Sequence, residues 1–297
     1  MVDVVLKIEA LPLRGFDSVA SERLVTAGGG FNAMSAAARQ GMHVAYVGQL
    51  GTGVFADIAR DALGGESIEV AVRTPEAQDL GFCIVLVDQE GERTFVTSPG
   101  AEGTLTATDL ATVEMQDGDY VSLSGYNFVY SAIREETMKW FDQLSDGVLV
   151  CFDAGPRVLD IPESTRREVL ARTDWLLCNL GEATSLTGES VPTRCVERLL
   201  TMSGRRGVVV RVGAKGCVGA RRGEGLVEVA GFKVQVVDTN GAGDVHNGVF
   251  LAEIARGTSF VEALQRANVA ASIAVGRFGP ATCPTRDAVT QKLVLSF

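Results

Sequence analysis

The stretch Asp238-Thr239-Asn240-Gly241-Ala242-Gly243-Asp244 decides how this chain is interpreted. The β-branched run at 233–237 before it predicts a strand, and the spacing of apolar residues after it predicts a helix that starts at about Ala242. A glycine-rich turn between a strand and a helix directs backbone N–H groups and the positive end of the helix dipole at one spot. That spot suits a phosphate or a developing phosphoryl charge.

Asp244 falls in the first turn of the predicted helix, beside the expected anion site. A carboxylate there can act as a general base for an attacking hydroxyl, while the amides of Gly241, Ala242 and Gly243 hold the transferring phosphoryl group. The helix start is expected to lower the pKa of Asp244. A loose phosphoryl transition state tolerates such a weak base, because the hydroxyl loses its proton late. On spacing alone, Asp244 could equally be a helix cap.

The composition is that of a globular protein without nucleic acid or membrane partners. The chain has 297 residues, 46% of them hydrophobic, which is enough for one large α/β domain or two small ones. A net charge of −10 argues against nucleic acid or an anionic membrane as a partner. The six cysteines are scattered without a C-x-x-C pair, which favours a reducing cytoplasm and no zinc site. No signal peptide or bilayer-spanning apolar run is recognised.

Apolar strand patterns alternate with helical patterns through the second half of the chain. The strand patterns lie at 120–123, 148–152, 175–178, 208–212 and 234–237. Such alternation predicts an α/β fold in which a mostly parallel sheet carries helices on both faces. Ligands of such folds bind at the carboxyl ends of the strands, so we expect the site there.

The stretch resembles the signature D-T-x-G-A-G-D of the ribokinase-like (PfkB) carbohydrate kinase family at every fixed position, and further motifs follow in the family's order. The resemblance implies a three-layer α/β/α sandwich over 1–297, with a β-sheet lid inserted at about 4–27 and 74–100. Strand patterns at 4–11, 23–26, 82–88 and 93–98 fit that lid. A lid would exclude water, which competes with the sugar hydroxyl. The final Asp of the signature is the family's catalytic base, here Asp244.

On the substrate side, the resemblance implies that Asp3, Gly28, Gly29, Asn32 and Asp244 contact the sugar. Asn32 also follows a triple glycine and precedes a run of small helix-forming residues, so we predict that it caps that helix. Most of the family's opening strand is missing ahead of Asp3. Phe31 stands where the family commonly has Ala and could stack on a sugar ring or narrow the pocket. His246 stands where the family has Phe, and we interpret it as a packing residue.

On the nucleotide side, Asn179 and Glu182 match the family's N-x-x-E motif, in which Glu182 would hold a hydrated Mg²⁺. The segment from Arg211 to Gly216 resembles the nucleotide loop, with Arg211 in place of Thr; Arg211 could reach phosphates or form a surface ion pair. The residues implied in cofactor binding are Asn179, Glu182, Arg211, Gly213, Gly216, Gly243 and Asn268, the last beside adenine on a helix at 260–278. The ligands implied for a monovalent cation such as K⁺ are Asp238, Asn240, Ala274, Arg277 and Gly279.

These features predict an ATP- and Mg²⁺-dependent kinase that phosphorylates a hydroxyl of a small sugar, with Asp244 as the base. Family members often dimerise through the lid, so a homodimer is a candidate assembly. Two alternatives stay open. The first is a nucleoside kinase of the same fold, in which Phe31 stacks on a base. The second is a sugar- or nucleotide-binding protein without turnover. The departures that allow it are Gly53, where the family usually has Asp, Arg211, His246 and the missing opening strand.

Overall fold

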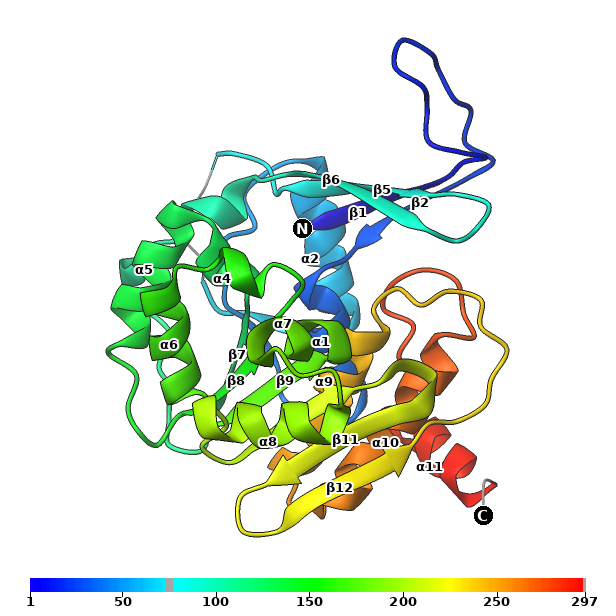
Figure 1. Cartoon of the computed structure of the whole chain (residues 1–297). Helices are drawn as coiled ribbons and strands as arrows, with labels where there is room; N and C mark the ends of the chain where they lie inside the picture. The colour runs from blue at the N-terminus through cyan, green and yellow to red at the C-terminus, as the bar shows by residue number, and fades with distance from the viewer. Residues whose placement is uncertain (73–76, 296–297) are drawn as a thin grey trace.

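The computed structural model describes residues 1–72 and 77–295, and its centre is a six-stranded sheet (Figure 1). The strands are β7 (Tyr120–Ser124), β8 (Leu149–Asp153), β9 (Trp175–Asn179), β10 (Gly207–Arg211), β11 (Gly216–Arg221) and β12 (Gly225–Ala230). Their order is β12-β11-β10-β9-β8-β7. Strands β7 to β10 are parallel, whereas β11 and β12 add an antiparallel hairpin at one edge. The predicted, mostly parallel sheet is therefore confirmed.

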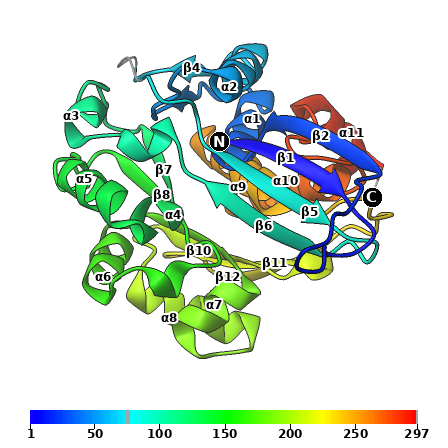
Figure 2. The ribbon, with the colours of Figure 1, turned by 90° about the horizontal axis from the view of Figure 1, so that it is seen from above.

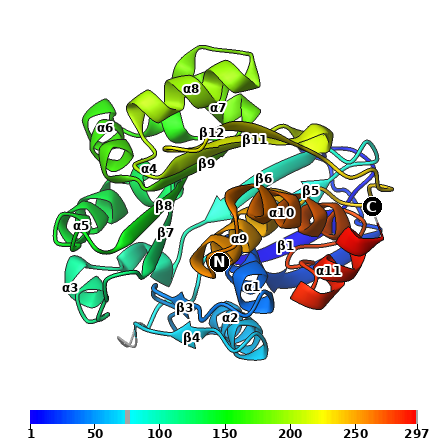
Figure 3. The ribbon, with the colours of Figure 1, turned by 90° about the horizontal axis from the view of Figure 1, so that it is seen from below.

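Helices cover both faces of this sheet, which gives the three expected layers (Figure 3). The helices that pack on one face are α3 (Ala107–Leu110), α4 (Tyr126–Val129), α5 (Ser131–Phe141), α6 (Glu163–Arg172), α7 (Leu180–Thr187) and α8 (Pro192–Met202). Those on the other face are α1 (Gly30–Arg39), α9 (Ala242–Ala255), α10 (Phe260–Ala274) and α11 (Arg286–Val294). In the part of the chain that the structure describes, no helix is long and apolar enough to cross a bilayer.

The sequence of β9 shows why the layers form. Its residues are apolar at successive positions, so both faces of the strand are buried, as in parallel sheets. Trp175 and Leu177 enter the core beneath α9 and α10, while Leu176 and Cys178 enter the core beneath α6 to α8. A strand alternates its side chains between the two faces, so one short run contributes to both cores.

The lid is a second sheet that lies over the carboxyl edge of the first (Figure 2). Its strands are β1 (Val2–Lys7), β2 (Glu22–Ala27), β5 (Phe82–Val87) and β6 (Arg93–Ser98), in the order β2-β1-β5-β6. β1 pairs along its whole length with β2 on one side and with β5 on the other. The strand predicted at 4–11 therefore begins two residues earlier, so that it includes Asp3, and ends earlier, at Lys7. The predicted start of the second lid segment, at 74, lies outside the described residues.

Several predicted boundaries are wrong. The run at 233–237 forms no strand; instead the N–H groups of Val237 and Asp238 both donate to the carbonyl of Val275, and Val237 is 56% exposed. The helix predicted at 260–278 ends earlier, at Ala274. The sequence patterns also did not predict the β11–β12 hairpin or six smaller or outlying elements. These are the parallel pair β3 (Ala45–Tyr46) and β4 (Glu69–Val70), the helix α2 (Val54–Gly65), and the 3-10 turns at Ala101–Thr104, Val158–Asp160 and Gly213–Lys215.

Candidate active site

Polar residues gather where the parallel strands end. Asp153, Asn179 and Arg211 are the last residues of β8, β9 and β10. α9 begins at Ala242, as predicted, after Gly241 adopts a left-handed conformation with φ of 71°. An L-residue pays roughly 1–2 kcal/mol for that conformation, so glycine suits this turn. Asp244 thus enters the same region from the first turn of α9.

The backbone N–H groups around this turn have few acceptors within the described residues. The Ala242 N–H donates to the Thr239 carbonyl at 3.3 Å, a long and weak bond. For the N–H groups of Gly241 and Gly243, the described residues provide no acceptor. Unpaired amides at a helix start are a ready site for phosphate oxygens.

Asn32 holds the carboxylate of Asp244 in a defined position. The Asn32 Nδ2 group donates to Asp244 Oδ2 at 3.2 Å, and Asn32 Oδ1 accepts from the Ala281 N–H at 2.9 Å. Because Oδ1 must face the Ala281 N–H, the NH₂ group must face Asp244. Asn32 is only 3% exposed. The predicted helix-capping role of Asn32 is wrong, since the residue at the N-cap of α1 is Gly29.

The environment of Asp244 raises its pKa to about 7, because the carboxylate is buried and because the charge of Asp153 lies nearby. The hydrogen bond from Asn32 and the charge of Arg211 oppose this increase. The predicted decrease is therefore wrong: burial and a like charge outweigh the helix dipole. A base whose pKa is near neutral pH is well matched to proton transfer, and the residue remains partly exposed, so a ligand can reach it.

Arg211 lies beneath the glycine turn as a largely buried cation, with 14% of its side chain exposed. Its guanidinium donates to the side chain of Asn247 and lies 3.4 Å from Asp153 and 3.9 Å from Glu182. A Cβ atom added to Gly243 would lie 3.5 Å from the guanidinium. The alternative of a surface ion pair is therefore wrong. Arg211 places positive charge directly against the expected anion site.

Glu182 and Asn179 form a reciprocal cap at the start of α7. Glu182 Oε2 accepts from the Asn179 N–H and Oε1 from Asn179 Nδ2, both at 2.8 Å, while Asn179 Oδ1 accepts from the Glu182 N–H at 2.9 Å. No three acidic, His or Cys side chains converge on a metal position among the residues described. This donor set fits a magnesium ion that keeps its waters and is held mainly by phosphates.

On the substrate side, Asp3 and Gly28 are in close contact. A Cβ on Gly28 would lie 2.1 Å from Asp3 Oδ2, so only glycine fits beside this carboxylate. Burial raises the pKa of Asp3 to about 6, although the nearby N-terminal amino group opposes the increase.

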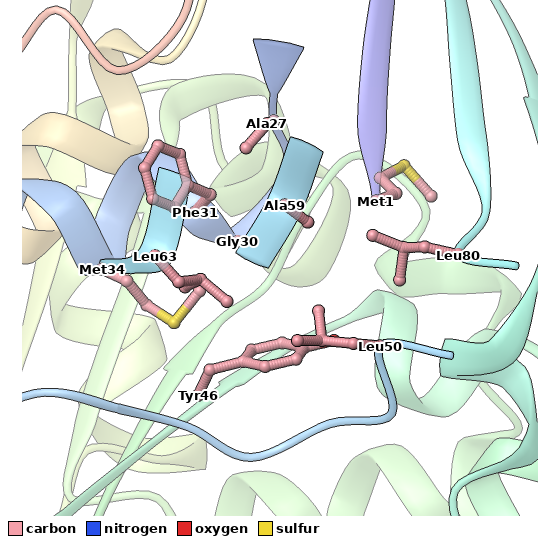
Figure 4. A pocket seen from close by; sticks show the side chains of 11 residues that line it. Met1, Ala27, Gly30, Phe31, Met34, Tyr46, Leu50, Ala59, Leu63 and Leu80 are labelled. Atoms are coloured by element: carbon pink, nitrogen blue, oxygen red, sulfur yellow. The ribbon is translucent and has the colours of Figure 1, made fainter. Parts of the chain in front are cut away.

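Phe31 and His246 both belong to the protein interior. Phe31 is 8% exposed and lines an apolar cavity of about 50 Å³ next to the triple glycine, together with Met34 and Leu63 (Figure 4). It is thus part of the core, and the expectation that it stacks on a ligand loses its basis. His246 is 2% exposed and burial lowers its pKa to about 3, so the imidazole is neutral. This agrees with a packing role.

The remaining predicted ligands lie farther along the sheet. Asn268 is 6% exposed, and its Nδ2 donates to the carbonyls of Val229 and Ala230, which ties α10 to β12. Gly213 and Gly216 have φ of 63° and 101° and shape the turn between β10 and β11. Gly213 and Gly216 lie in the turn that follows the carboxyl end of β10. Their contact with a nucleotide, and that of Asn268, stays a prediction.

The carboxylate of Asp238 already has a cationic partner. Arg93 of the lid strand β6 forms an ion pair with Asp238, whose oxygens also accept from the N–H groups of Asn240 and Gly279 at 2.7 and 3.0 Å. The Ala274 carbonyl, another predicted K⁺ ligand, accepts from the Thr282 hydroxyl at 3.2 Å. No local pattern in the sequence indicates this contact of Arg93, because its partner lies 145 residues away along the chain.

Comparison with known proteins gives one consistent result. The family model described as pfkB family carbohydrate kinase matches residues 2–287. The chain is 30% identical to the uncharacterized sugar kinase YegV of Escherichia coli (strain K12), over 97% of this chain and 89% of that protein. It is 29% identical to the ATP-dependent ribose-1-phosphate kinase of Halopiger xanaduensis, over 97% and 93% of the two chains.

Solved structures share the same architecture. The ribokinase of Arabidopsis thaliana, complexed with ribose and ATP, superposes with a TM-score of 0.77 at 25% identity, covering 98% of this chain and 95% of that chain. The similarity therefore spans the lid and the three layers together.

Proposed function

This chain belongs to the PfkB family of carbohydrate kinases and phosphorylates a hydroxyl group of a sugar at the expense of ATP; we propose that Asp244 is the general base of this reaction. The observation that carries the proposal is the environment of its carboxylate. Asp244 is oriented by Asn32 and has a pKa of about 7. It stands in the first turn of a helix whose leading amides lack protein acceptors among the described residues.

In the proposed reaction, the sugar hydroxyl oxygen attacks the γ-phosphorus of ATP, and the bond from that phosphorus to the β–γ bridging oxygen breaks. ADP leaves, and the hydroxyl proton passes to Asp244. The amides of Gly241, Ala242 and Gly243 stabilise the transferring phosphoryl group, because charge on its oxygens meets preorganised donors there. For the Ala242 N–H this requires release of its long bond to Thr239.

We propose that Asp3, Gly28 and Gly29 bind the acceptor sugar and that Asn32 contributes by orienting Asp244. The positive charge of Arg211 beneath Gly243 supports the phosphates. Asn179 and Glu182 would hold hydrated Mg²⁺, which neutralises phosphate charge when it is bound. Gly213, Gly216 and Asn268 border the side on which we place the nucleoside of ATP.

We further propose that 1–297 form one domain with its lid, and that two copies pair through the outer face of the lid. The register aligns six apolar side chains on the face opposite Asp3: Val4, Leu6, Val25, Ile84, Leu86 and Val96. Val25 and Val96 are 44% and 56% exposed, and an apolar sheet face of this kind favours association. Sedimentation of the wild type and of Val96→Lys tests this: the substitution is expected to shift a dimer toward monomer.

We place the protein in the cytoplasm, because all six cysteines are free and buried. We rank the nucleoside alternative below the sugar kinase, because Phe31, which would stack on a base, is 8% exposed and packs in the core. The alternative without turnover leaves the oriented base at Asp244 unexplained.

A coupled assay of ADP release against a panel of sugars, sugar phosphates, sugar acids and nucleosides tests the proposal. Release stimulated by a sugar or its derivative is expected, and Asp244→Asn should abolish most of it. Stimulation by nucleosides alone would overturn the sugar assignment. An Asp244→Asn protein as active as the wild type would overturn the role of the base.

A further inference from the structure

Arg93 connects the lid to the stretch that carries the catalytic base. It begins β6, an edge strand of the lid, and its guanidinium pairs with Asp238 and lies 3.4 Å from the hydroxyl of Thr239. The side chains of Arg93 and Asp238 are 16% and 5% exposed. A carboxylate this deeply buried requires a cation or hydrogen-bond donors to remain ionised, and Arg93 supplies the cation.

Asp238 is joined to Asp244 by two routes through the protein. Along the chain, Asp238 Oδ1 accepts from the Asn240 N–H at the start of the glycine turn. Through space, Asp238 Oδ2 accepts from the Gly279 N–H, and two residues later the Ala281 N–H donates to Asn32, which in turn donates to Asp244. A displacement of Asp238 would therefore disturb both the anion site and the orientation of the base.

The residues present do not fit an additional monovalent cation at Asp238. The resemblance implies that such a cation would share this carboxylate, but the carboxylate already carries a full guanidinium charge and two backbone hydrogen bonds. The Ala274 carbonyl accepts from the Arg277 N–H at 3.0 Å and from the Thr282 hydroxyl. A second cation would face Arg93 with only one carboxylate to balance two positive charges.

We propose that Arg93 is a positioning residue of the lid. Its guanidinium neutralises Asp238 in place of a bound monovalent cation, so the kinase does not depend on K⁺. Because the cation is attached to a lid strand, Asp238 is neutralised only while the lid lies over the site. The position of the lid is thereby coupled to the geometry of the glycine turn. The inference rests on the proposed function, because kinase activity is one of its readouts.

The test compares kcat of the wild type, Arg93→Ala and Arg93→Lys in KCl and in choline chloride at equal ionic strength. Arg23→Ala, an exposed arginine on lid strand β2, is the matched control. The wild type and the control should be equally active in both salts. Arg93→Ala should lose about tenfold to a hundredfold in choline and regain activity when K⁺ or guanidinium ion is added, while Arg93→Lys should retain most activity.

A second readout does not depend on catalysis. The melting temperature of Arg93→Ala should rise on exchange of choline for K⁺, whereas those of the wild type, the control and Asp244→Asn should not. A wild type that K⁺ stimulates several-fold overturns the proposal. So does a folded Arg93→Ala protein that is fully active in choline, or one that neither K⁺ nor guanidinium restores. If Asp244→Asn stays active, the base assignment fails while the melting comparison still tests Arg93.

Discussion

Replacing Asp244 by Asn should make the protein more stable at alkaline pH while it removes activity. Asparagine keeps the shape of the side chain and can still accept the hydrogen bond from Asn32 through its carbonyl oxygen. What it lacks is the charge that the folded site disfavours. If this substitution stabilises the protein, the ionised carboxylate of Asp244 lowers the stability of the folded wild type.

The magnitude follows from the pKa of Asp244, which burial and the charge of Asp153 raise from 3.8 to about 7. One pKa unit corresponds to about 1.36 kcal/mol, so ionising Asp244 costs the folded state at most roughly 4 kcal/mol. The folded protein keeps this proton until about pH 7, whereas the unfolded chain releases it near 3.8. The folded state therefore binds more protons in that interval, and its stability falls as pH rises through it.

The assay is urea unfolding of the wild type and Asp244→Asn at pH 5 and pH 8, with Asp61→Asn, an exposed acid on α2, as control. The gain from Asp244→Asn should be small near pH 4, increase up to about pH 7 and then level off. The same variant should lose about 10²–10⁴-fold in kcat. Equal stability of the variant and the wild type at pH 8, or a gain that does not change with pH, would show that the folded state does not disfavour the charge of Asp244.

Three further outcomes follow from the same contacts. In the wild type, kcat/KM should fall as the pH drops below about 7, where Asp244 becomes protonated. Asn32→Ala should lower kcat about tenfold and move this decline to higher pH, because the hydrogen bond that it removes holds the pKa of Asp244 down. Gly28→Ala should raise KM for the sugar but not for ATP, since its Cβ would lie 2.1 Å from the carboxylate of Asp3; initial rates varied in each substrate check this. Arg211→Met should raise KM for ATP and lower the melting temperature, because Asp153 loses its cation.

Local signals in the sequence predict much of the fold. The start of α9 at Ala242 follows from a glycine turn and an apolar helical pattern, and β6 is predicted with its observed bounds at Arg93–Ser98. The strand expected at 233–237 fails because β propensity requires a partner strand, and this segment donates to the carbonyl of Val275 instead. The hairpin of β11 and β12 was missed because its short apolar runs contain glycines.

The sequence predicts which residues form the candidate site, but it does not predict their pKa values or their ion pairs. A motif brings Asp244 to a helix start, and from that position alone its pKa should fall. The observed rise depends on Asp153 and on burial, both of which come from the fold. In the same way, the ion pair of Arg93 with Asp238 joins the lid to the glycine turn. The residues around each partner in the sequence do not predict this pair.

The most direct test of the base assignment is one distance, measured in a crystal structure of the wild type with its best sugar substrate and a non-hydrolysable ATP analogue. We expect an oxygen of Asp244 to lie about 2.6–3.2 Å from the accepting hydroxyl, with that hydroxyl in line with the γ-phosphate. A sugar bound with all its hydroxyls out of reach of Asp244, or a γ-phosphate held away from the start of α9, would contradict it.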